Sequence, residues 1–150
     1  MTPPHPSDKY FYLAAAIITD ASDRLLVVRK QNTHKFMLPG GKIEAGETPR
    51  EALLRELEEE IALKIEASLP IFIQEYEAPA ANEPDYRIKS NLFRVKLDEI
   101  LTIHPEAEIA EIRWVEKDQT EGIDFAPLIE SFVIPLWRSE LENAAHSDID

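Results

Sequence analysis

The sequence contains no cysteine among its 150 residues. Disulfide scaffolds, thiolate metal sites and cysteine nucleophiles are therefore excluded as chemistries for this chain. It also lacks any run approaching the roughly 20 apolar residues that a helix needs to cross a bilayer. The first residues, MTPPHPSDKY, show neither the basic start nor the apolar run of a secretory signal. Together these absences predict an intracellular, cytoplasmic protein with no membrane partner.

Basic residues are scarce: the chain has 16 Lys and Arg against 29 Asp and Glu, and a formal net charge of -13. Proteins that bind nucleic acid polymers usually present a basic face to the phosphate backbone, so such a partner is not expected. A small anionic substrate remains compatible with this charge if a cation lies between it and the acidic side chains. The composition therefore points toward metal chemistry.

A chain of this length is typical of one domain, which buries roughly 70% of its unfolded surface. Hydrophobic residues make up 44% of the sequence and charged residues 30%, as in ordinary globular proteins. Both ends are poor in apolar runs. We therefore expect a single domain over residues 9–141, between flexible tails at residues 1–8 and 142–150.

Apolar and β-branched residues predict strands at residues 11–19, 25–30, 71–77, 86–97 and 109–116, the first two forming a hairpin. Helices are expected at residues 49–61 and 127–141, with Pro135 kinking or dividing the second. Strands mostly in succession, with two helices set apart, predict an α/β (α+β) fold in which helices flank a mixed sheet. Trp114 and Trp137 are expected in its core.

The first helix has a clear start, because Thr48 can cap it, Pro49 suits its first turn and Glu51 completes a capping box. On this helix Glu56, Glu59 and Glu60 fall within an arc of roughly 100°. A neighbouring arc is apolar and comprises Leu53, Leu54, Leu57 and Ile61.

The three glutamates repel one another, and a divalent cation would reverse that penalty. Carboxylate oxygens suit Mg²⁺, with Mn²⁺ as a substitute. The helix alone leaves open the alternative that these glutamates form an ordinary solvated face.

The segment LPGGKIEAGE precedes this helix and places Gly40 and Gly41 in a loop where backbone atoms can approach a ligand closely. Read together, the loop and the helix resemble the signature box of the Nudix hydrolase family over residues 41–63. The residues that match in register are Gly41, Glu47, Arg55, Glu56, Leu57, Glu59, Glu60 and Leu63. Ala62 stands where the family has glycine, which should either extend the helix or strain the following turn.

The resemblance implies an α/β/α sandwich and a Mg²⁺-dependent hydrolase that cleaves the pyrophosphate bond of a nucleoside diphosphate linked to another moiety. An ADP-sugar such as ADP-ribose and a (d)NTP are both candidate substrates. By the same match, Glu56, Glu59 and Glu60 bind metal with help from the carbonyl of Gly40. Glu47 and Arg55 support the cluster, and Glu59 or Glu60 lies near the attacking water.

Other residues are candidates on weaker grounds. Glu108 is the choice for a further metal ligand among the acidic residues before Trp114, against the alternative of a surface charge. Arg29, Lys42 and Gly41 are expected to contact substrate, although each charge taken alone also reads as a surface residue. The loop at residues 78–83, APAANE, either lines the pocket or forms an ordinary turn.

Two other functions are compatible with the fold that the resemblance implies. A non-catalytic nucleotide-sensing domain would be expected to have lost its carboxylates, which are intact here. The isoprenoid isomerase branch is a poor match because its chemistry uses a cysteine. The sequence leaves open the exact substrate, the general base, the number of metal ions and whether the chain forms a homodimer.

Overall fold

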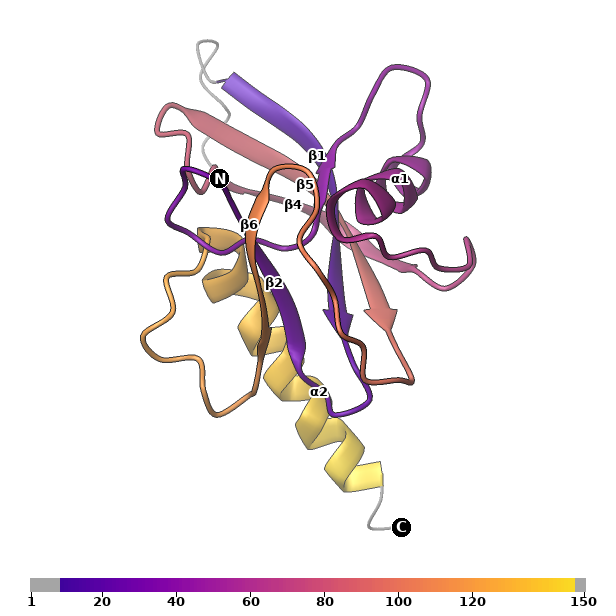
Figure 1. The fold of residues 1–150 in the computed structure, drawn as a ribbon. Helices are drawn as coiled ribbons and strands as arrows, with labels where there is room; N and C mark the ends of the chain where they lie inside the picture. Colours follow the sequence, from indigo (N-terminus) through magenta and orange to yellow (C-terminus); the bar gives the residue numbers. More distant parts are fainter. Residues whose placement is uncertain (1–8, 148–150) are drawn as a thin grey trace.

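The computed structural model describes residues 9–147, which form a six-stranded mixed sheet flanked by helices (Figure 1). The strand order is β4-β5-β1-β2-β6, with β3 paired to β1. The sheet is mixed because β1 is parallel to β5 and antiparallel to β2 and β3. The strands are β1 (Lys9–Thr19), β2 (Leu25–Lys30), β3 (Gly40–Lys42), β4 (Ile71–Pro79), β5 (Tyr86–Lys96) and β6 (Ile109–Val115), and the helical segments are α1 (Pro49–Ile61), the π-helical turn η1 (Ile129–Val133) and α2 (Ile134–Ser147).

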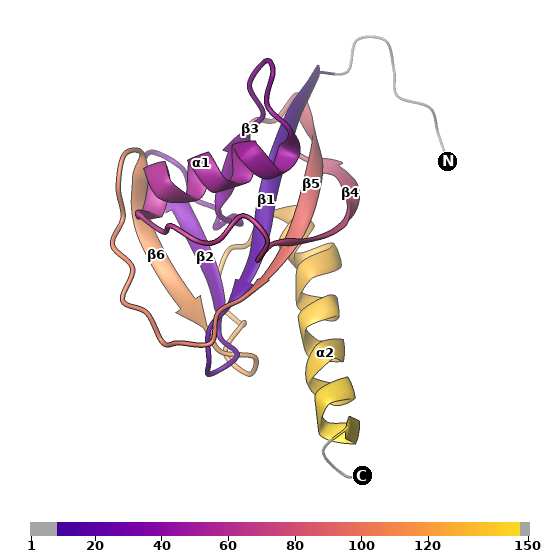
Figure 2. The same cartoon turned by 90° about the vertical axis from the view of Figure 1, so that its right-hand side faces the viewer.

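Helices α1 and α2 lie on opposite faces of the sheet (Figure 2). Alternate residues of β1 divide between the two cores: Ala14 and Ala16 pack on the α1 side, Ala15 and Ile17 on the α2 side. A strand buried on both faces reads as a continuous apolar run, which explains the segment LAAAII in β1. The expected α/β/α sandwich is confirmed.

The predicted strands are all present with slightly displaced ends, but sequence reasoning missed β3. This strand has three residues and two of them are glycine, so it carries no strand signal. Gly40 lies so close to β1 that a Cβ there would come within 2.2 Å of the Ala14 carbonyl oxygen. Strands β1 and β2 pair with each other at Thr19 and Leu25, next to the turn that joins them. Farther from the turn, the segment containing β3 lies between the two strands and pairs with both.

Helix α1 begins and ends as its sequence dictates. The Glu51 backbone N–H donates to the Thr48 hydroxyl at 3.1 Å, and the Thr48 N–H donates to the Glu51 carboxylate at 3.0 Å, which is the predicted capping box. At the other end, Ala62 adopts the left-handed conformation with φ 53°. Of the two expected consequences of the missing glycine, the strained turn is the one found, because the helix stops at Ile61.

Near Pro135 the second helical segment is divided into two parts, η1 and α2, without an interruption between them. The π-helical turn η1 precedes Pro135, and the Ile134 N–H donates to the Ile129 carbonyl, five residues earlier. A proline has no N–H and its ring clashes with the carbonyl four residues before it, so a wider turn lets the helix continue. The helix runs past the expected end at residue 141 and reaches Ser147. The remainder of both expected tails, residues 1–8 and 148–150, lies outside the described residues.

The two tryptophans differ in how deeply they are buried. Trp137 is fully buried in the core on the α2 side, and its indole N–H donates to the Asp23 carbonyl at 3.1 Å. Trp114 is half-buried against the α1 side. Among residues 9–147, no helix is long and apolar enough to cross a membrane.

Candidate active site

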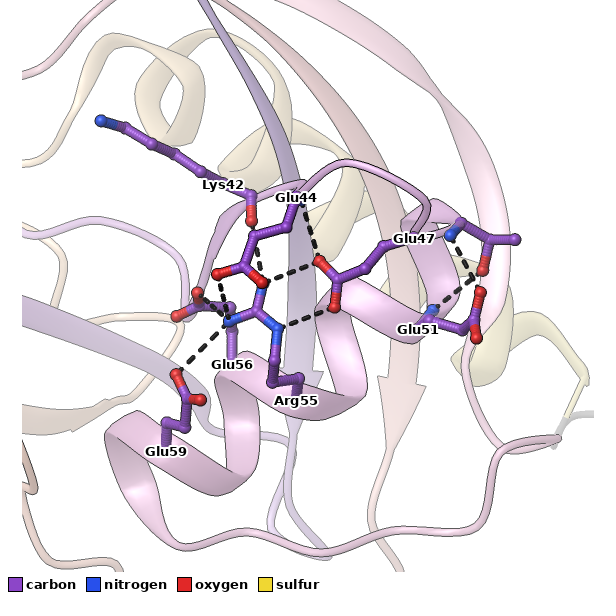
Figure 3. Close-up of polar contacts among 8 residues, drawn as sticks. Lys42, Glu44, Glu47, Glu51, Arg55, Glu56 and Glu59 are labelled. Atoms are coloured by element: carbon purple, nitrogen blue, oxygen red, sulfur yellow. Dashed lines mark hydrogen bonds and ion pairs between the residues drawn. The ribbon is translucent and has the colours of Figure 1, made fainter.

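Arg55 holds the segment before α1 against the helix (Figure 3). Its guanidinium donates two hydrogen bonds to the Glu47 carboxylate, at 2.7 and 2.9 Å, and a third to the Lys42 carbonyl at 3.1 Å. The remaining nitrogen, Nη1, donates to Glu56 at 2.7 Å and to Glu59 at 3.4 Å. One planar side chain therefore fixes both the loop and two of the helix carboxylates, as the fork geometry of arginine allows.

The pairing of Arg55 with Glu47 has a clear electrostatic signature. Hydrogen bonds from the Arg55 guanidinium lower the pKa of the Glu47 carboxyl to about 2, with a further contribution from the backbone N–H of Glu44. The charged form of Glu47 is therefore the one that the fold stabilises. This contact agrees with the expectation that Glu47 and Arg55 hold the acidic cluster in place.

The Glu56 carboxylate occupies the space that a side chain on Gly41 would fill, so a larger residue there would displace it. A Cβ on Gly41 would lie 2.4 Å from the Glu56 carboxyl carbon, far inside van der Waals contact. The φ of Gly41 is not in the left-handed region, so its backbone conformation suits any residue. The absence of a side chain, and the room that this gives a carboxylate, is what the position needs.

Glu60 is the buried member of the acidic group, with 7% of the residue exposed. Burial raises the pKa of its carboxyl to about 7; the charge of Lys30 opposes this rise, while the nearby Glu56 and Glu108 carboxylates add to it. Its Oε2 atom has no hydrogen-bond partner among the described residues. A buried carboxylate oxygen in this condition is one that a bound cation would satisfy.

The three helix glutamates occupy different environments. Glu60 belongs to the buried face of α1, the side chain of Glu56 is 15% exposed, and that of Glu59 is 58% exposed. Within residues 9–147, no three acidic or histidine side chains are gathered closely enough to hold a metal ion as they stand. In this arrangement Glu56 and Glu59 instead lie against the Arg55 guanidinium. Metal binding by the three glutamates, the Gly40 carbonyl and Glu108 stays a prediction.

The donor set nevertheless fits a hard divalent cation. It consists of carboxylate oxygens beside Gly40 and Gly41, which lie in the short strand β3 rather than in the expected loop, and such oxygens are the ligands that Mg²⁺ and Mn²⁺ prefer. The unpartnered Oε2 of Glu60 and the mutual repulsion of Glu56, Glu60 and Glu108 are both features that a bound cation would relieve.

A cavity of about 350 Å³ opens beside these residues. Its acidic end contains Glu60, Glu108, Lys30 and the two glycines of β3, whereas the Lys42 ammonium lies over the ring of Phe11. Its apolar end contains Leu13, Ile88, Leu128, Ile129 and the loop at residues 79–83. The volume lies within the usual range for small-molecule sites.

The structure brings some of the predicted substrate and metal residues to this cavity and not others. Gly40, Gly41, Lys42 and Glu108 line it, and so does most of the APAANE loop, which favours the pocket over an ordinary turn for that loop. Figure 3 shows the Lys42 side chain extending away from the carboxylates that surround Arg55. Of the acidic residues before Trp114, Glu108 is the one in the cavity wall.

Arg29 is not brought to the cavity. Its guanidinium donates to Glu111 at 3.3 Å and to the Thr33 carbonyl at 2.9 Å. The next residue along β2, Lys30, lines the cavity in its place. Alternation along the strand puts Val28 and Lys30 on one face and Arg29 on the other, a signal available in the segment LLVVRK. Lys30 was one of the basic residues that the sequence offered for phosphate contact, whereas Ser90 was missed because nothing in β5 marks it.

Comparison with known proteins gives a consistent picture. A family model described as NUDIX domain matches residues 9–132. Over 59 residues the chain is 37% identical to the 8-oxo-dGTP diphosphatase of Escherichia coli (strain K12), a match that covers 37% of this chain and 46% of that protein. Over 70 residues it is 40% identical to the ADP-ribose pyrophosphatase of Methanocaldococcus jannaschii, covering 41% of each. The chain spans about half the length of the curated relatives it matches.

Solved structures agree on the fold. The MutT protein from Methanosarcina mazei Go1 superposes with a TM-score of 0.71 at 19% identity, covering 91% of this chain and 98% of that one. A bifunctional NMN adenylyltransferase/ADP ribose pyrophosphatase from Francisella tularensis, complexed with AMP and a Mn ion, gives a TM-score of 0.72 at 18% identity, covering 90% and 43%. At these identities the likeness concerns the fold alone.

Proposed function

Because this chain belongs to the NUDIX domain family, we propose that it hydrolyses the pyrophosphate bond of a nucleoside diphosphate linked to another moiety, with Mg²⁺ as cofactor. One observation carries this proposal. The buried Glu60 carboxylate, with an oxygen that no described residue satisfies, lines a nucleotide-sized cavity together with the glycines of β3 and Glu108. If these glutamates only formed a solvated helix face, the Glu60 carboxylate would be exposed rather than buried.

The residues that would hold the metal are Glu56, Glu59 and Glu60, with Glu108 and the Gly40 carbonyl beside them. When bound, the cation would neutralise the diphosphate and lower the pKa of a coordinated water.

The chain's own residues would do the rest. Arg55 would keep Glu56 and Glu59 oriented through the contacts described above. Lys30 and Lys42, which form no ion pair with a carboxylate in the described part of the chain, would bind the phosphate oxygens. Glu59 or Glu60 would accept the proton of the attacking water.

The substrate belongs to the nucleotide class, and two finer candidates follow from the relatives. One matched relative is named for 8-oxo-dGTP and another for ADP-ribose, so a (d)NTP and an ADP-sugar are both proposed. A cytoplasmic location, a homodimer and the domain limits at residues 9 and 141 stay predictions.

The test is direct. Purified protein is incubated with Mg²⁺ and, separately, with ADP-ribose, 8-oxo-dGTP and dGTP, and the products are separated by chromatography. We expect the corresponding nucleoside monophosphate from at least one of them. The Glu59→Gln variant should lower the rate by orders of magnitude. Glu58→Gln, at an exposed position on the same helix, is the matched control and should retain the rate.

Three outcomes would count against the proposal or part of it. If no compound yields product, the proposed hydrolase activity is wrong. If calorimetry shows tight binding of a nucleotide but no product forms, the nucleotide-sensing alternative is favoured. Unchanged turnover in Glu59→Gln would contradict the metal role of that carboxylate.

A further inference from the structure

Ser90 occupies an unusual position in the cavity wall. It lies on β5 in register with Leu13 of β1 and Tyr76 of β4, on the side of the sheet that faces α2. The residue is fully buried, yet it lines the cavity. Its hydroxyl oxygen has no hydrogen-bond partner among the described residues. A polar atom that is out of water and unpaired, at the wall of an open cavity, points to a ligand.

The surroundings of Ser90 restrict the chemistry of that ligand. Leu13, Ile88, Leu128 and Ile129 line the same end of the cavity, and none carries a charge. A phosphate or carboxylate would lose its hydration there without compensation. Of the two cavity lysines, Lys30 lies beside Glu60, whereas the Lys42 ammonium lies 4.3 Å from the centroid of the Phe11 ring, at the edge of this apolar lining. A neutral ring with one or more polar groups at its edge suits the apolar end best.

We infer that Ser90 is a specificity-determining residue, whose hydroxyl hydrogen-bonds a polar group on the edge of the substrate's base. The inference rests on the proposed nucleotide chemistry and extends it to a residue outside the acidic box. A serine hydroxyl can both donate and accept, so it can pair with an amino or a carbonyl group of the ring. Asn82, on the loop at residues 79–83, brings a second uncharged polar side chain to the same cavity. Its Nδ2 contacts the Met37 sulfur at 3.8 Å.

Selectivity follows from burial. A base that lacks the group opposite Ser90 leaves the hydroxyl unpaired in the complex, just as it is without ligand. A base that carries the group satisfies both partners at once. Sites that hydrogen-bond a substrate group discriminate against analogues lacking it much more strongly than apolar contacts alone do.

The first measurement is the thermal stability of Ser90→Ala without ligand. Because the variant removes an unpaired buried hydroxyl, its melting temperature should equal or exceed that of the wild type. Ser139→Ala is the matched control, because its hydroxyl donates to the Leu136 carbonyl at 2.7 Å, away from the cavity. The control should show no such gain. A clear loss of stability in Ser90→Ala would show that the hydroxyl serves the fold, and would overturn the inference.

The second measurement compares nucleotides that differ in the polar groups on the edge of the base. The pairs are 8-oxo-dGTP with dGTP, dGTP with dITP, and ADP-ribose with its hypoxanthine counterpart. Wild-type kcat/KM should differ within at least one pair, and Ser90→Ala should shrink that ratio about tenfold. Ser90→Cys keeps the side-chain size but bonds weakly, and should behave like Ser90→Ala. The ratios in Ser139→Ala should match the wild type.

The result is separable from that of the proposed function, because the same pairs are also measured by calorimetry in the presence of Mg²⁺. If Ser90→Ala loses discrimination in binding and no protein shows turnover, the specificity role of Ser90 is supported and the proposed hydrolase activity is wrong. Turnover whose ratios are unchanged in Ser90→Ala for every pair would retain the hydrolase and overturn the role of Ser90. Failure to bind any of these nucleotides would also overturn it.

Discussion

The two ends of the cavity are built in different ways. The acidic end comes from one continuous stretch, residues 40–60, together with Lys30 and Glu108, and it is held by ion pairs to Arg55. The apolar end is assembled from β1, β5, the loop at residues 79–83 and the start of the second helix. Its residues are held by packing rather than by charge. The difference suggests that chemistry and selectivity are carried by separately built parts of one site.

The largest test of this division is Glu60→Gln. If the acidic end carries the chemistry, this variant should lower kcat on the order of a thousandfold, because it removes a proposed metal ligand while preserving shape. The pKa of Glu60 is raised from 4.5 to about 7, so its contribution favours folding below pH 4.5 and is lost as pH rises through 7.

At pH 8 and with a chelator present, Glu60→Gln should therefore be at least as stable as the wild type in thermal melts. If the variant is less stable than the wild type under these conditions, Glu60 has a structural role in folding rather than the proposed role in metal binding. If Glu60→Gln retains the wild-type kcat, the claim that the acidic end carries the chemistry is wrong.

A second test uses Gly41→Ala, which adds one methyl group where the Glu56 carboxylate lies. Because the Cβ would come within 2.4 Å of that carboxyl carbon, Glu56 must move. A displacement of this size at a reacting centre costs about a hundredfold in rate. Steady-state kinetics should show the loss in kcat, with the preference among nucleotides retained. A changed preference with unchanged kcat would mean that Gly41 serves the apolar end instead.

The apolar end is tested by Ile88→Ala. Removing part of its wall should raise KM about tenfold, since apolar contact there binds the substrate equally in the ground and transition states. The kcat should stay within about twofold. Ile73→Ala is the control, because Ile73 packs against the same core without lining the cavity. An effect on kcat as large as that on KM would argue that the two ends are not separable.

The support of the acidic end is tested by pH. Arg55 holds the pKa of Glu47 at about 2, below its ordinary value of 4.5. This pair therefore stabilises the fold above pH 4.5, and the contribution is lost as pH falls through 2. The wild type should melt at a higher temperature than Glu47→Gln at pH 7, and the gap should close toward pH 2. Glu44→Gln, at a longer 3.8 Å contact to Arg55, should show a smaller gap; an equal gap would contradict the assignment.

The smallest expected effect is that of Ala62→Gly. Ala62 has φ 53°, a conformation in which glycine avoids the strain of a Cβ. The variant should gain about 1 kcal/mol in urea unfolding without altering turnover, because Ala62 ends α1 and lies outside the cavity wall. Ala67→Gly, in a turn of ordinary φ, should show no gain. Loss of activity in Ala62→Gly would mean that the strained turn helps to position the glutamates.

The sequence predicted the acidic end in more detail than the apolar end, for a physical reason. Contacts within the acidic end are local, so spacing along the chain reveals them: Thr48, Glu51, Arg55 and Glu47 all behave as their positions indicate. What spacing could not reveal is how each side chain is turned. Glu60 is buried and Glu59 is exposed, although both were expected on one side of the helix. For Arg29 and Lys30, in contrast, alternation along β2 does indicate which side chain meets the cavity.

The apolar end depends on contacts between residues far apart in sequence. Ser90 meets Leu13 across a parallel strand pair, and that pairing is not encoded by either segment alone. The short strand β3 was missed for a related reason, since Gly40 and Gly41 are placed by their fit against β1 and Glu56 rather than by strand propensity. The loop at residues 78–83 was recognised only as a candidate.

The wide turn before Pro135 lies between two parts of one helix with different surroundings. Leu128 and Ile129 come before or at its start and touch the cavity, while Trp137 comes after it and anchors the core. A π-turn adds one residue to a helical circuit and so rotates everything beyond it by roughly 100°. The residues that line the cavity and the residues that pack against the sheet therefore face directions that the π-turn sets independently, although they belong to one continuous helical segment.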